Sequence, residues 1–297
     1  MTVVVTGSAG FIGSALVAHL LEQGHGVVGV DRVAQEPQPG LVVLTADLLA
    51  RDELVDAAFA TADGVVHLAG RPGVRENVPG IERYREQDNV AATARVLAAV
   101  PLAVPLVVAS SSSVYGGTRG ASRETDPLHP RGGYAQSKVR AEQLCARRLR
   151  SGGIVAVARP FTVIGERQRR DMAVSRWLEA ALAGRPLRVF GSLERRRDLT
   201  DVRDVGRVLA GLVQHGVCGP VNVGTGRSYR LREVVEAVEA ACGVCAPVDI
   251  VPASGDEAEA TRADTTRLRN LLGFVPATDL HEVVARQLAA RRVEAVA

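Results

Sequence analysis

The stretch TGSAGFIG at residues 6–13 restricts the fold of this chain more than any other feature. It follows a short β-branched run at residues 3–6 and opens a segment whose apolar residues recur with helical spacing. Short apolar runs of this kind are typical of buried parallel strands. Gly7 permits a tight turn, Gly10 lets the backbone approach a pyrophosphate, and Gly13 allows close helix–strand packing. The stretch therefore predicts a dinucleotide-binding unit.

Short apolar runs and helix-period segments alternate through the first half of the chain. Strands are predicted at 26–31, 41–48, 64–70, 105–112 and 154–160, and helices near 51–60, 87–100 and 133–150. Strand, helix and strand in series predict a parallel sheet with helices on both faces.

After about residue 165 the pattern becomes mainly helical. Helices are predicted near 172–183, 202–214, 231–242, 265–272 and 280–293, with short strands at 187–190, 221–224 and 248–251. We therefore expect an α/β fold with a Rossmann-type doubly wound parallel sheet over residues 1–164. Residues 201–225 are expected to pack back onto it, and 165–297 to form a smaller, mainly α C-terminal substrate-binding domain.

Composition narrows the classes of partner. The net charge of +3 is too small to favour nucleic acid as a main partner, and no run approaches about 20 apolar residues, so no membrane span is expected. The N-terminus lacks the basic region and cleavage site of a signal peptide. The cysteines, Cys145, Cys218, Cys242 and Cys245, are not spaced as a disulfide framework, which favours a cytoplasmic location. Cys242 and Cys245 lack a second ligand pair, so no metal is expected.

Asp31 ends the predicted second strand, 18 residues after Gly13. A carboxylate at this place hydrogen-bonds the ribose 2′-hydroxyl and repels a 2′-phosphate, which favours NAD over NADP. The adjacent Arg32 weakens the distinction, because a guanidinium binds the extra phosphate.

Lys138 is the single lysine among 36 lysine and arginine residues, and it lies four residues after Tyr134. On a helix the two side chains share a face. A nearby ammonium is expected to lower the pKa of the phenol and make it a base, and a compact ammonium also suits a cofactor ribose better than a planar guanidinium. Ser111, in the serine run 110–113 at a strand end, is placed to bond a substrate hydroxyl. The alternatives are an accidental Tyr/Lys spacing and a simple polar turn.

Six motifs follow one another along the chain in an order and spacing that identify a family. They are TGSAGFIG, Asp31, Asp47-Leu48, HLAG (67–70), SSSSVYG (110–116) and YAQSK (134–138). Together they resemble the extended short-chain dehydrogenase/reductase family. Within it, the chain resembles the NAD-dependent nucleotide-sugar epimerase/dehydratase branch, in particular the UDP-glucose and UDP-glucuronate 4-epimerases. The resemblance covers nearly the whole chain and includes the segments 159–173, 186–205 and 221–226.

The resemblance implies a site for NAD and a site for a nucleotide sugar. The implied NAD contacts are Gly7, Gly10, Phe11, Ile12 and Gly13 at the pyrophosphate, Asp31 and Arg32 at the adenosine ribose, Asp47 and Leu48 at the adenine, and Leu68, Ala69, Asn89, Tyr134 and Lys138 along the channel. The implied catalytic residues are Ser111, Tyr134 and Lys138. The implied substrate contacts are Ser111, Thr162 and Arg197, with Ser113 beside them in the serine run. The arginine that the family pattern expects near 252–257 is absent, and Arg262 is the candidate to replace it. A homodimer through the helices near 89–100 and 133–150 is also implied.

Departures from the branch pattern favour one activity within it. Dehydratases of the branch carry an Asp-Glu pair where this chain has Ser112 and Ser113, and a hydroxyl is too weak an acid or base for that elimination. Thr162 is similar to the uronic-acid 4-epimerases, whereas Ile164 and Glu166 replace the usual tyrosine and proline.

We therefore expect NAD-dependent epimerisation at C4 of a UDP-hexose, of the UDP-glucose/galactose or UDP-glucuronate type, through a transient 4-keto intermediate. Alternatives are an NAD(P)-dependent nucleotide-sugar reductase or dehydrogenase, an atypical dehydratase, and a non-catalytic NAD-sensing binding protein.

Overall fold

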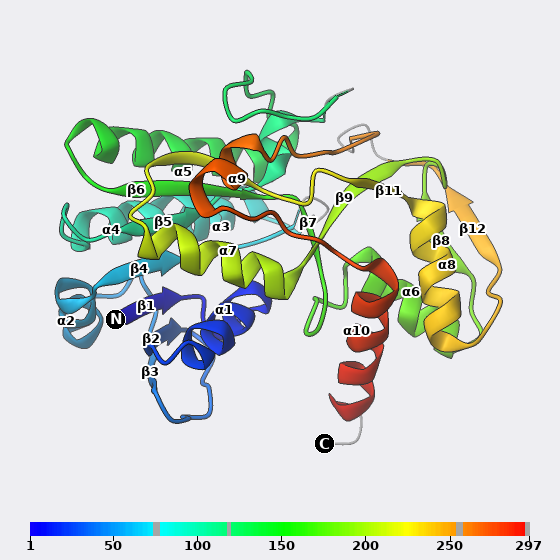
Figure 1. The fold of residues 1–297 in the computed structure, drawn as a ribbon, viewed down its shortest axis with the longest axis horizontal. Helices are drawn as coiled ribbons and strands as arrows, with labels where there is room; N and C mark the ends of the chain where they lie inside the picture. Colours follow the sequence, from blue (N-terminus) through cyan, green and yellow to red (C-terminus); the bar gives the residue numbers. More distant parts are fainter. Residues whose placement is uncertain (74–77, 118–119, 254–257, 295–297) are drawn as a thin grey trace.

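The computed structural model describes residues 1–73, 78–117, 120–253 and 258–294. Within them a seven-stranded parallel sheet has the order β10-β6-β5-β4-β1-β2-β3. Its strands are β1 (Thr2–Thr6), β2 (Gly26–Asp31), β3 (Leu41–Thr45), β4 (Gly64–His67), β5 (Leu106–Ala109), β6 (Val155–Pro160) and β10 (Gly219–Val223). The order 3-2-1-4-5-6 is that of the doubly wound dinucleotide-binding fold, here extended by β10. The predicted fold class is confirmed (Figure 1).

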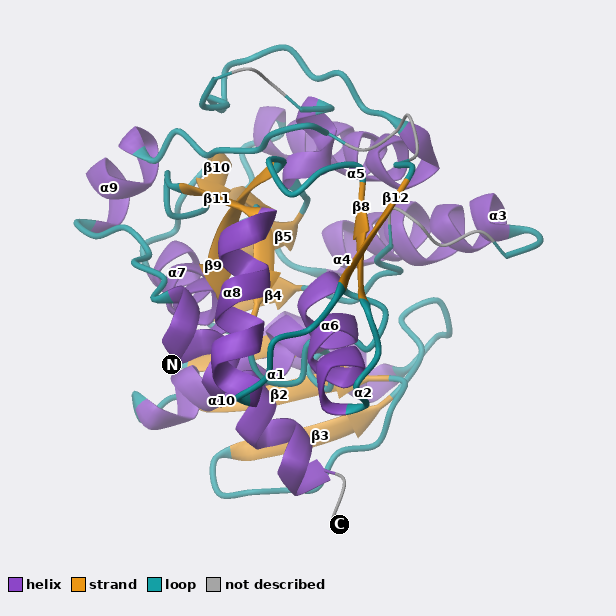
Figure 2. Ribbon diagram, turned by 90° about the vertical axis from the view of Figure 1, so that its right-hand side faces the viewer, coloured by secondary structure: helices purple, strands orange, loops and turns teal. Residues whose placement is uncertain are grey.

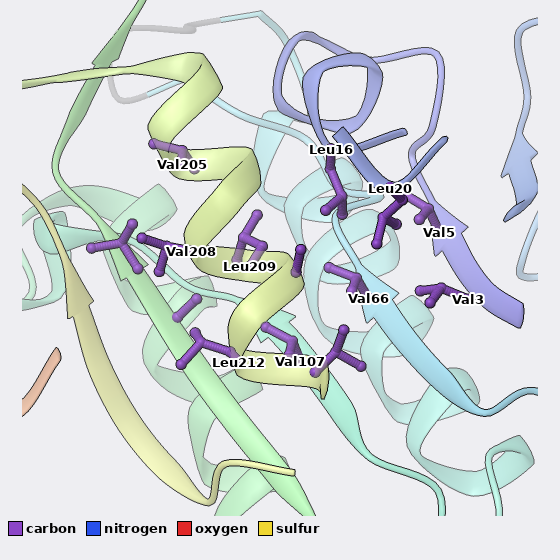
Figure 3. Close-up of a cluster of buried hydrophobic side chains, with 14 of the residues drawn as sticks. Val3, Val5, Leu16, Leu20, Val66, Val107, Val205, Val208, Leu209 and Leu212 are labelled. Atoms are coloured by element: carbon purple, nitrogen blue, oxygen red, sulfur yellow. The ribbon is translucent and has the colours of Figure 1, made fainter. Parts of the chain in front are cut away.

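Helices cover both faces of this sheet because its strands are apolar on both sides. On β1, Val3 and Val5 join one cluster of buried side chains and Val4 joins another. The first cluster includes α1 (Phe11–Glu22) and α7 (Val202–Gln214), whose leucines pack over Val66 and Val107, as Figure 3 shows. The second includes α2 (Glu53–Thr61), α4 (Ala92–Ala99) and α5 (Gly132–Arg150).

A second unit with its own apolar core lies beside the sheet, on the side that Figure 2 turns toward the viewer. Its helices are α6 (Ala173–Leu182), α8 (Leu231–Cys242) and α10 (Leu280–Glu294), while α9 (Thr266–Leu272) packs on β10. β8 (Leu187–Phe190) pairs with β12 (Val248–Val251) in parallel. β9 (Arg196–Asp201) pairs with β7 (Thr162–Ile164) and with β11 (Ser228–Arg230).

Several predicted boundaries were wrong. The predicted strand 105–112 ends at Ala109, because Ser111 caps a short 3₁₀ helix, η2 (Ser112–Tyr115), through its side chain. The predicted helix 87–100 is the π-helical turn η1 (Glu86–Ala91) followed by α4, and α3 (Ile81–Arg85) precedes it. The predicted strand 41–48 ends at Thr45.

Among the described residues, no helix is long and apolar enough to span a membrane. The same residues contain no cluster of three or more histidine, cysteine or acidic side chains that could hold a metal ion. The four cysteines are free thiols, and Cys242 is the last residue of α8.

Candidate active site

The glycine loop between β1 and α1 leaves no room for a side chain at Gly7 or Gly13. Gly7 has a φ of +74°, and a Cβ there would lie 2.6 Å from the Ala69 amide nitrogen. A Cβ on Gly13 would lie 2.0 Å from the Gly7 carbonyl oxygen. Gly10 is the N-cap of α1 and has an extended backbone conformation. The first amides of a helix have no intrahelical partner. The loop is therefore a backbone cradle at a positive helix end, which is suited to a phosphate.

The acidic end of β2 is tied to this cradle. Asp31 accepts hydrogen bonds from the amides of Ala9 and Val33, each at 3.0 Å. The Arg32 guanidinium lies 3.3 Å from an Asp88 carboxylate oxygen and 3.9 Å from an Asp47 oxygen. The Arg32 cation therefore already has carboxylate partners. Leu48 is buried in the core below Asp47.

A buried histidine links the end of β4 to both neighbouring elements. His67 Nδ1 lies 2.7 Å from Thr6 Oγ1, and Nε2 lies 3.1 Å from Thr93 Oγ1. Since Thr93 donates its proton to the Asn89 carbonyl, it accepts from His67, so the neutral ring carries its proton on Nε2. Burial, with a smaller contribution from the Lys138 charge, lowers the pKa of His67 to about 3. The ring is a structural connector and no acid or base at neutral pH.

Asn89 connects the strand ends to the helix that carries Tyr134. Its side-chain oxygen accepts from the Arg71 amide at 2.8 Å, and its nitrogen donates to the Arg71 carbonyl and to Ser137 Oγ. Ser137 Oγ in turn donates to the Tyr134 carbonyl at 2.7 Å. Both amide donors of Asn89 are thus engaged within the protein, and its expected place along the cofactor channel stays a prediction.

The three predicted catalytic side chains come together beyond the carboxyl end of β5. Tyr134 and Lys138 share one face of α5, and the Ser111 side chain lies near enough to the Tyr134 phenol to oppose the rise in its pKa. Ser111 Oγ also accepts from the Ser113 amide at 3.1 Å, which fixes the hydroxyl. Lys138 Nζ donates to the Ala109 carbonyl at 2.9 Å. This edge of a parallel sheet is where α/β folds bind ligands.

The predicted substrate-side residues lie on separate segments. Thr162 is half-buried at the start of β7, and Ser113 Oγ is buried with no partner among the described residues. Arg197 on β9 donates to the Arg196 and Glu259 carbonyls at 2.8 and 3.2 Å. Arg262 is exposed, and its carbonyl accepts from the Ser122 amide. Ser113 therefore lies beside Ser111 and the other predicted catalytic residues. Arg197 lies apart from them on β9, and Arg262 lies in the loop before α9.

Residues 3–224 match the model of a protein family described as the NAD dependent epimerase/dehydratase family. The chain belongs to this family. It is 32% identical to a Bacillus subtilis protein described as an uncharacterized UDP-glucose epimerase, over 97% of each chain. It is 27% identical to a Danio rerio UDP-glucuronic acid decarboxylase, over 94% of this chain and 70% of that protein.

Solved structures of this epimerase/dehydratase family have the same fold. MoeE5 in complex with UDP-glucuronic acid and NAD is 34% identical, with a TM-score of 0.90 over 99% of this chain and 100% of that one. A Bacillus cereus UDP-glucuronic acid 4-epimerase in complex with UDP-glucuronic acid and NAD is 27% identical, with a TM-score of 0.91 over the same shares.

The glycine loop fits the dinucleotide of this NAD-dependent family. Cβ atoms on Gly7 and Gly13 would collide with backbone, so the amides of the cradle remain open to a phosphate. Asp31 stands at the ribose end of that cradle, and its two backbone bonds hold it in place. A 2′-phosphate would be repelled by Asp31 and would have to displace Asp47 or Asp88 from Arg32, so the geometry fits NAD better than NADP.

The expected lowering of the Tyr134 pKa by Lys138 was wrong. Burial raises the pKa of Tyr134, and the Ser111 hydrogen bond and the charges of Arg169 and Arg85 only partly oppose it. Burial also lowers the pKa of Lys138 to about 8. Removal from water outweighs the attraction between phenolate and cations, so the resting pair is a neutral phenol beside a weakened ammonium.

Arg169 is a residue of this site that the sequence interpretation missed. Its charge acts on Tyr134, and its guanidinium forms a two-pronged ion pair with Asp171, 2.8 Å from Nε to Oδ1. The neighbouring Arg167, at a φ of 63°, reaches the Ala9 carbonyl of the glycine loop at 3.5 Å. The segment after β7 therefore overhangs both the cradle and the phenol. The arginines at 167, 169 and 170 signalled this segment, but their spacing did not show which of them turns inward.

Proposed function

We propose that this chain is an NAD-dependent epimerase that inverts C4 of a UDP-hexose through a transient 4-keto sugar. The convergence of Ser111, Tyr134 and Lys138 beside a dinucleotide cradle carries the proposal. Serines in place of a carboxylate pair at 112 and 113 support epimerisation over dehydration. In this proposal, residues 1–164 and 201–225 hold the cofactor, and 165–297 hold the nucleotide sugar.

Four sets of residues would hold NAD. The amides of Phe11, Ile12 and Gly13 at the start of α1 would bind the pyrophosphate, with Gly7 and Gly10 giving room. Asp31 and Arg32 would meet the adenosine ribose, Asp47 and Leu48 the adenine, and Leu68 and Ala69 the channel wall. When bound, oxidised NAD supplies the hydride acceptor for C4 and a positive charge near the phenol.

Tyr134 is the proposed base for the C4 hydroxyl. Ser111 orients that hydroxyl and donates to the phenol oxygen, which favours the phenolate. Lys138 adds a positive charge one helical turn away and can bond a ribose while it stays bonded to the Ala109 carbonyl. Because burial raises the pKa of Tyr134, we expect proton transfer once the bound cofactor and substrate stabilise the phenolate.

Arg169 favours a hexuronate among the candidate sugars. In this proposal the Arg169 guanidinium, whose charge acts on the phenol, would meet the sugar ring on which the phenol works. A carboxylate at C6 matches the two-pronged donor geometry that Arg169 now offers to Asp171. Arg197 on β9 and Arg262 in the loop before α9 are the proposed contacts to the diphosphate, and Thr162 and Ser113 those to the sugar.

The test is ¹H NMR of the products formed from UDP-glucuronate, UDP-galacturonate, UDP-glucose and UDP-galactose. We expect interconversion of the C4 epimers without accumulation of free NADH, fastest for the uronate pair, and none with Tyr134→Phe. Stoichiometric NADH would indicate a dehydrogenase, an alkene or deoxy sugar a dehydratase, and loss of CO₂ a decarboxylase. If no UDP-hexose is converted, the proposed function is wrong.

Substitution of Arg169 tests the preference for a uronate. Arg169→Gln is expected to lower kcat/KM for UDP-glucuronate by roughly 10- to 100-fold, since a charged hydrogen bond contributes about 1.5–3 kcal/mol. Activity on UDP-glucose should change little. Arg170→Gln, at the exposed neighbouring position, is the matched control and should leave both unchanged. Equal losses on both sugars in Arg169→Gln would show that Arg169 has no role in uronate selection.

A homodimer through α4 and α5 stays a prediction. The two helices pack against each other in the protomer and cover part of one face of the sheet. Light scattering on the purified protein is expected to give twice the mass of one 297-residue chain, and a monomer at micromolar concentration would contradict this.

A further inference from the structure

A buried ion pair lies behind the proposed active site. Arg159 on β6 and Glu142 on α5 form two parallel bonds, 2.6 Å from Nη2 to Oε2 and 3.0 Å from Nε to Oε1. Their side chains are only 5% and 10% exposed. Removing two charges from water is costly, and good geometry often no more than offsets that cost. The pair therefore calls for a role other than stability.

The carboxylate of the pair is bonded to the segment that carries the catalytic hydroxyl. Glu142 Oε1 accepts from Ser110 Oγ at 2.5 Å. Ser110 lies between Ala109, whose carbonyl accepts from Lys138 Nζ, and Ser111. Glu142 also follows Lys138 by one helical turn, so the two side chains share a face of α5. The Glu142 carboxylate thus binds the serine segment directly and lies on the same face of α5 as Lys138.

The guanidinium of the pair holds the far end of the same segment. Arg159 Nη1 donates to Tyr115 Oη at 2.8 Å, and Tyr115 Oη donates to Asn222 on β10 at 2.7 Å. Arg159 Nη1 also donates to the Glu124 carbonyl. The pair therefore fixes residues 110 and 115 at once, and with them the hydroxyl of Ser111 between them.

We propose that the Glu142–Arg159 pair is a positioning device for the catalytic lysine, which holds the serine segment in place and keeps the Lys138 ammonium charged at neutral pH. The proposal rests on the proposed function, which gives Lys138 its role. Glu142 and Arg159 act through Lys138 and Ser111, and touch neither substrate nor cofactor in this account.

The charges around the lysine support this assignment. The titratable groups set near the ammonium are Glu142, Cys145 and Tyr134 on α5, His67 on β4, Arg159 on β6, and Asp88 on η1, which is bound by Arg32 and Arg71. Burial lowers the pKa of Lys138 to about 8, and Cys145 and Glu142 oppose that fall. Burial raises the pKa of the Cys145 thiol to about 12, so it is neutral at pH 7. Glu142 is therefore the anion that sustains the lysine charge.

The single lysine allows a test that needs no substrate. In protein labelled with ¹³C-lysine, Lys138 gives the sole lysine Cε signal, and its shift against pH reports the ionisation directly. Glu142→Gln keeps an acceptor for Ser110 but removes the anion and leaves Arg159 unpaired. We expect its titration midpoint to fall by about one pH unit or more. The alkaline limb of kcat/KM should move by the same amount.

Two further variants separate electrostatics from folding. Glu142→Gln with Arg159→Met removes both charges, and its midpoint should lie between those of Glu142→Gln and the wild type. This variant also carries the test if the single one does not fold, since removing a whole buried pair is tolerated better than removing one partner. Arg148→Met is the control. Arg148 is a buried arginine on α5, and its hydrogen bonds within the described residues go to the carbonyls of residues 97, 100 and 101, so the variant should keep the wild-type midpoint.

A wild-type midpoint in both Glu142 variants would overturn the proposal and leave the pair with a structural role. Because the titration is independent of turnover, its outcome stands whether or not the protein epimerises a UDP-hexose. A shifted midpoint in an enzyme without epimerase activity would sustain the tuning of Lys138 and refute only the proposed function.

Discussion

Replacement of Lys138 by methionine is expected to lower kcat/KM by about 100-fold or more without loss of stability. Methionine keeps the length of the side chain but removes the charge that favours the phenolate of Tyr134 and the donor for a ribose. Lys138→Arg should lose as much activity, because the wider planar guanidinium cannot take the place of an ammonium bonded to the Ala109 carbonyl. Steady-state kinetics with the accepted UDP-sugar provide the measurement.

The stability of Lys138→Met should depend on pH in a defined direction. Burial lowers the pKa of Lys138 in the folded state to about 8 from its ordinary 10.5, so the folded state disfavours the charged form. The resulting penalty is fully present below pH 8 and is relieved as pH rises from about 8 to 10.5. Urea unfolding at pH 7 should therefore show a variant at least as stable as the wild type, with the advantage shrinking by pH 10.

Wild-type turnover in Lys138→Arg would show that the single lysine is an accident of an arginine-rich composition. Reduced stability of Lys138→Met at pH 7 would show that the ammonium supports the fold, contrary to its lowered pKa.

Gly13→Ala is expected to abolish cofactor retention and to destabilise the fold by about 3 kcal/mol or more. The added Cβ would lie 2.0 Å from the Gly7 carbonyl oxygen, and this neighbour is backbone that has no rotamer to move away. Relief requires α1 to shift from β1, which opens the phosphate cradle. Urea unfolding and the NAD content of the purified protein are the measurements.

Gly26→Ala is the matched control for the glycine loop. Gly26 lies in β2 beside β1, and its Cβ would meet Thr2 Oγ1 at 3.5 Å, an ordinary contact. It should change the free energy of unfolding by less than about 1 kcal/mol and leave NAD bound. If the two variants behaved alike, the close approach of Gly13 to Gly7 would not be what limits the loop.

The sheet could be predicted because its strands are buried on both faces. Residues 3–5 are a continuous apolar run and residues 26–30 contain only valine and glycine, and such runs belong to parallel strands covered by helices. β9 was missed because its sequence RRDLTD begins with charges, and its pairing to β7 and β11 comes from distant parts of the chain. No local pattern encodes a pairing of that kind.

The convergence of Ser111, Tyr134 and Lys138 could also be predicted, because strand order places Ser111 and α5 at one sheet edge. The direction of the pKa shift of Tyr134 could not be predicted from the sequence, because it depends on how deeply the tertiary fold buries the phenol. Arg169 and Arg159 are two of many arginines, and spacing alone does not show which reaches the site and which pairs with Glu142.

In the proposed reaction Tyr134 is the single base, and one NAD that stays bound removes the hydride from C4 and returns it. The fate of the C4 hydrogen tests this reaction most directly. UDP-glucuronate deuterated at C4 is incubated with the enzyme in ordinary water, and the products are examined by NMR and mass spectrometry. We expect the C4 epimer to form with deuterium retained at C4, because the same hydride is removed and returned. Loss of the label to solvent, or its release in free reduced cofactor, would contradict the account.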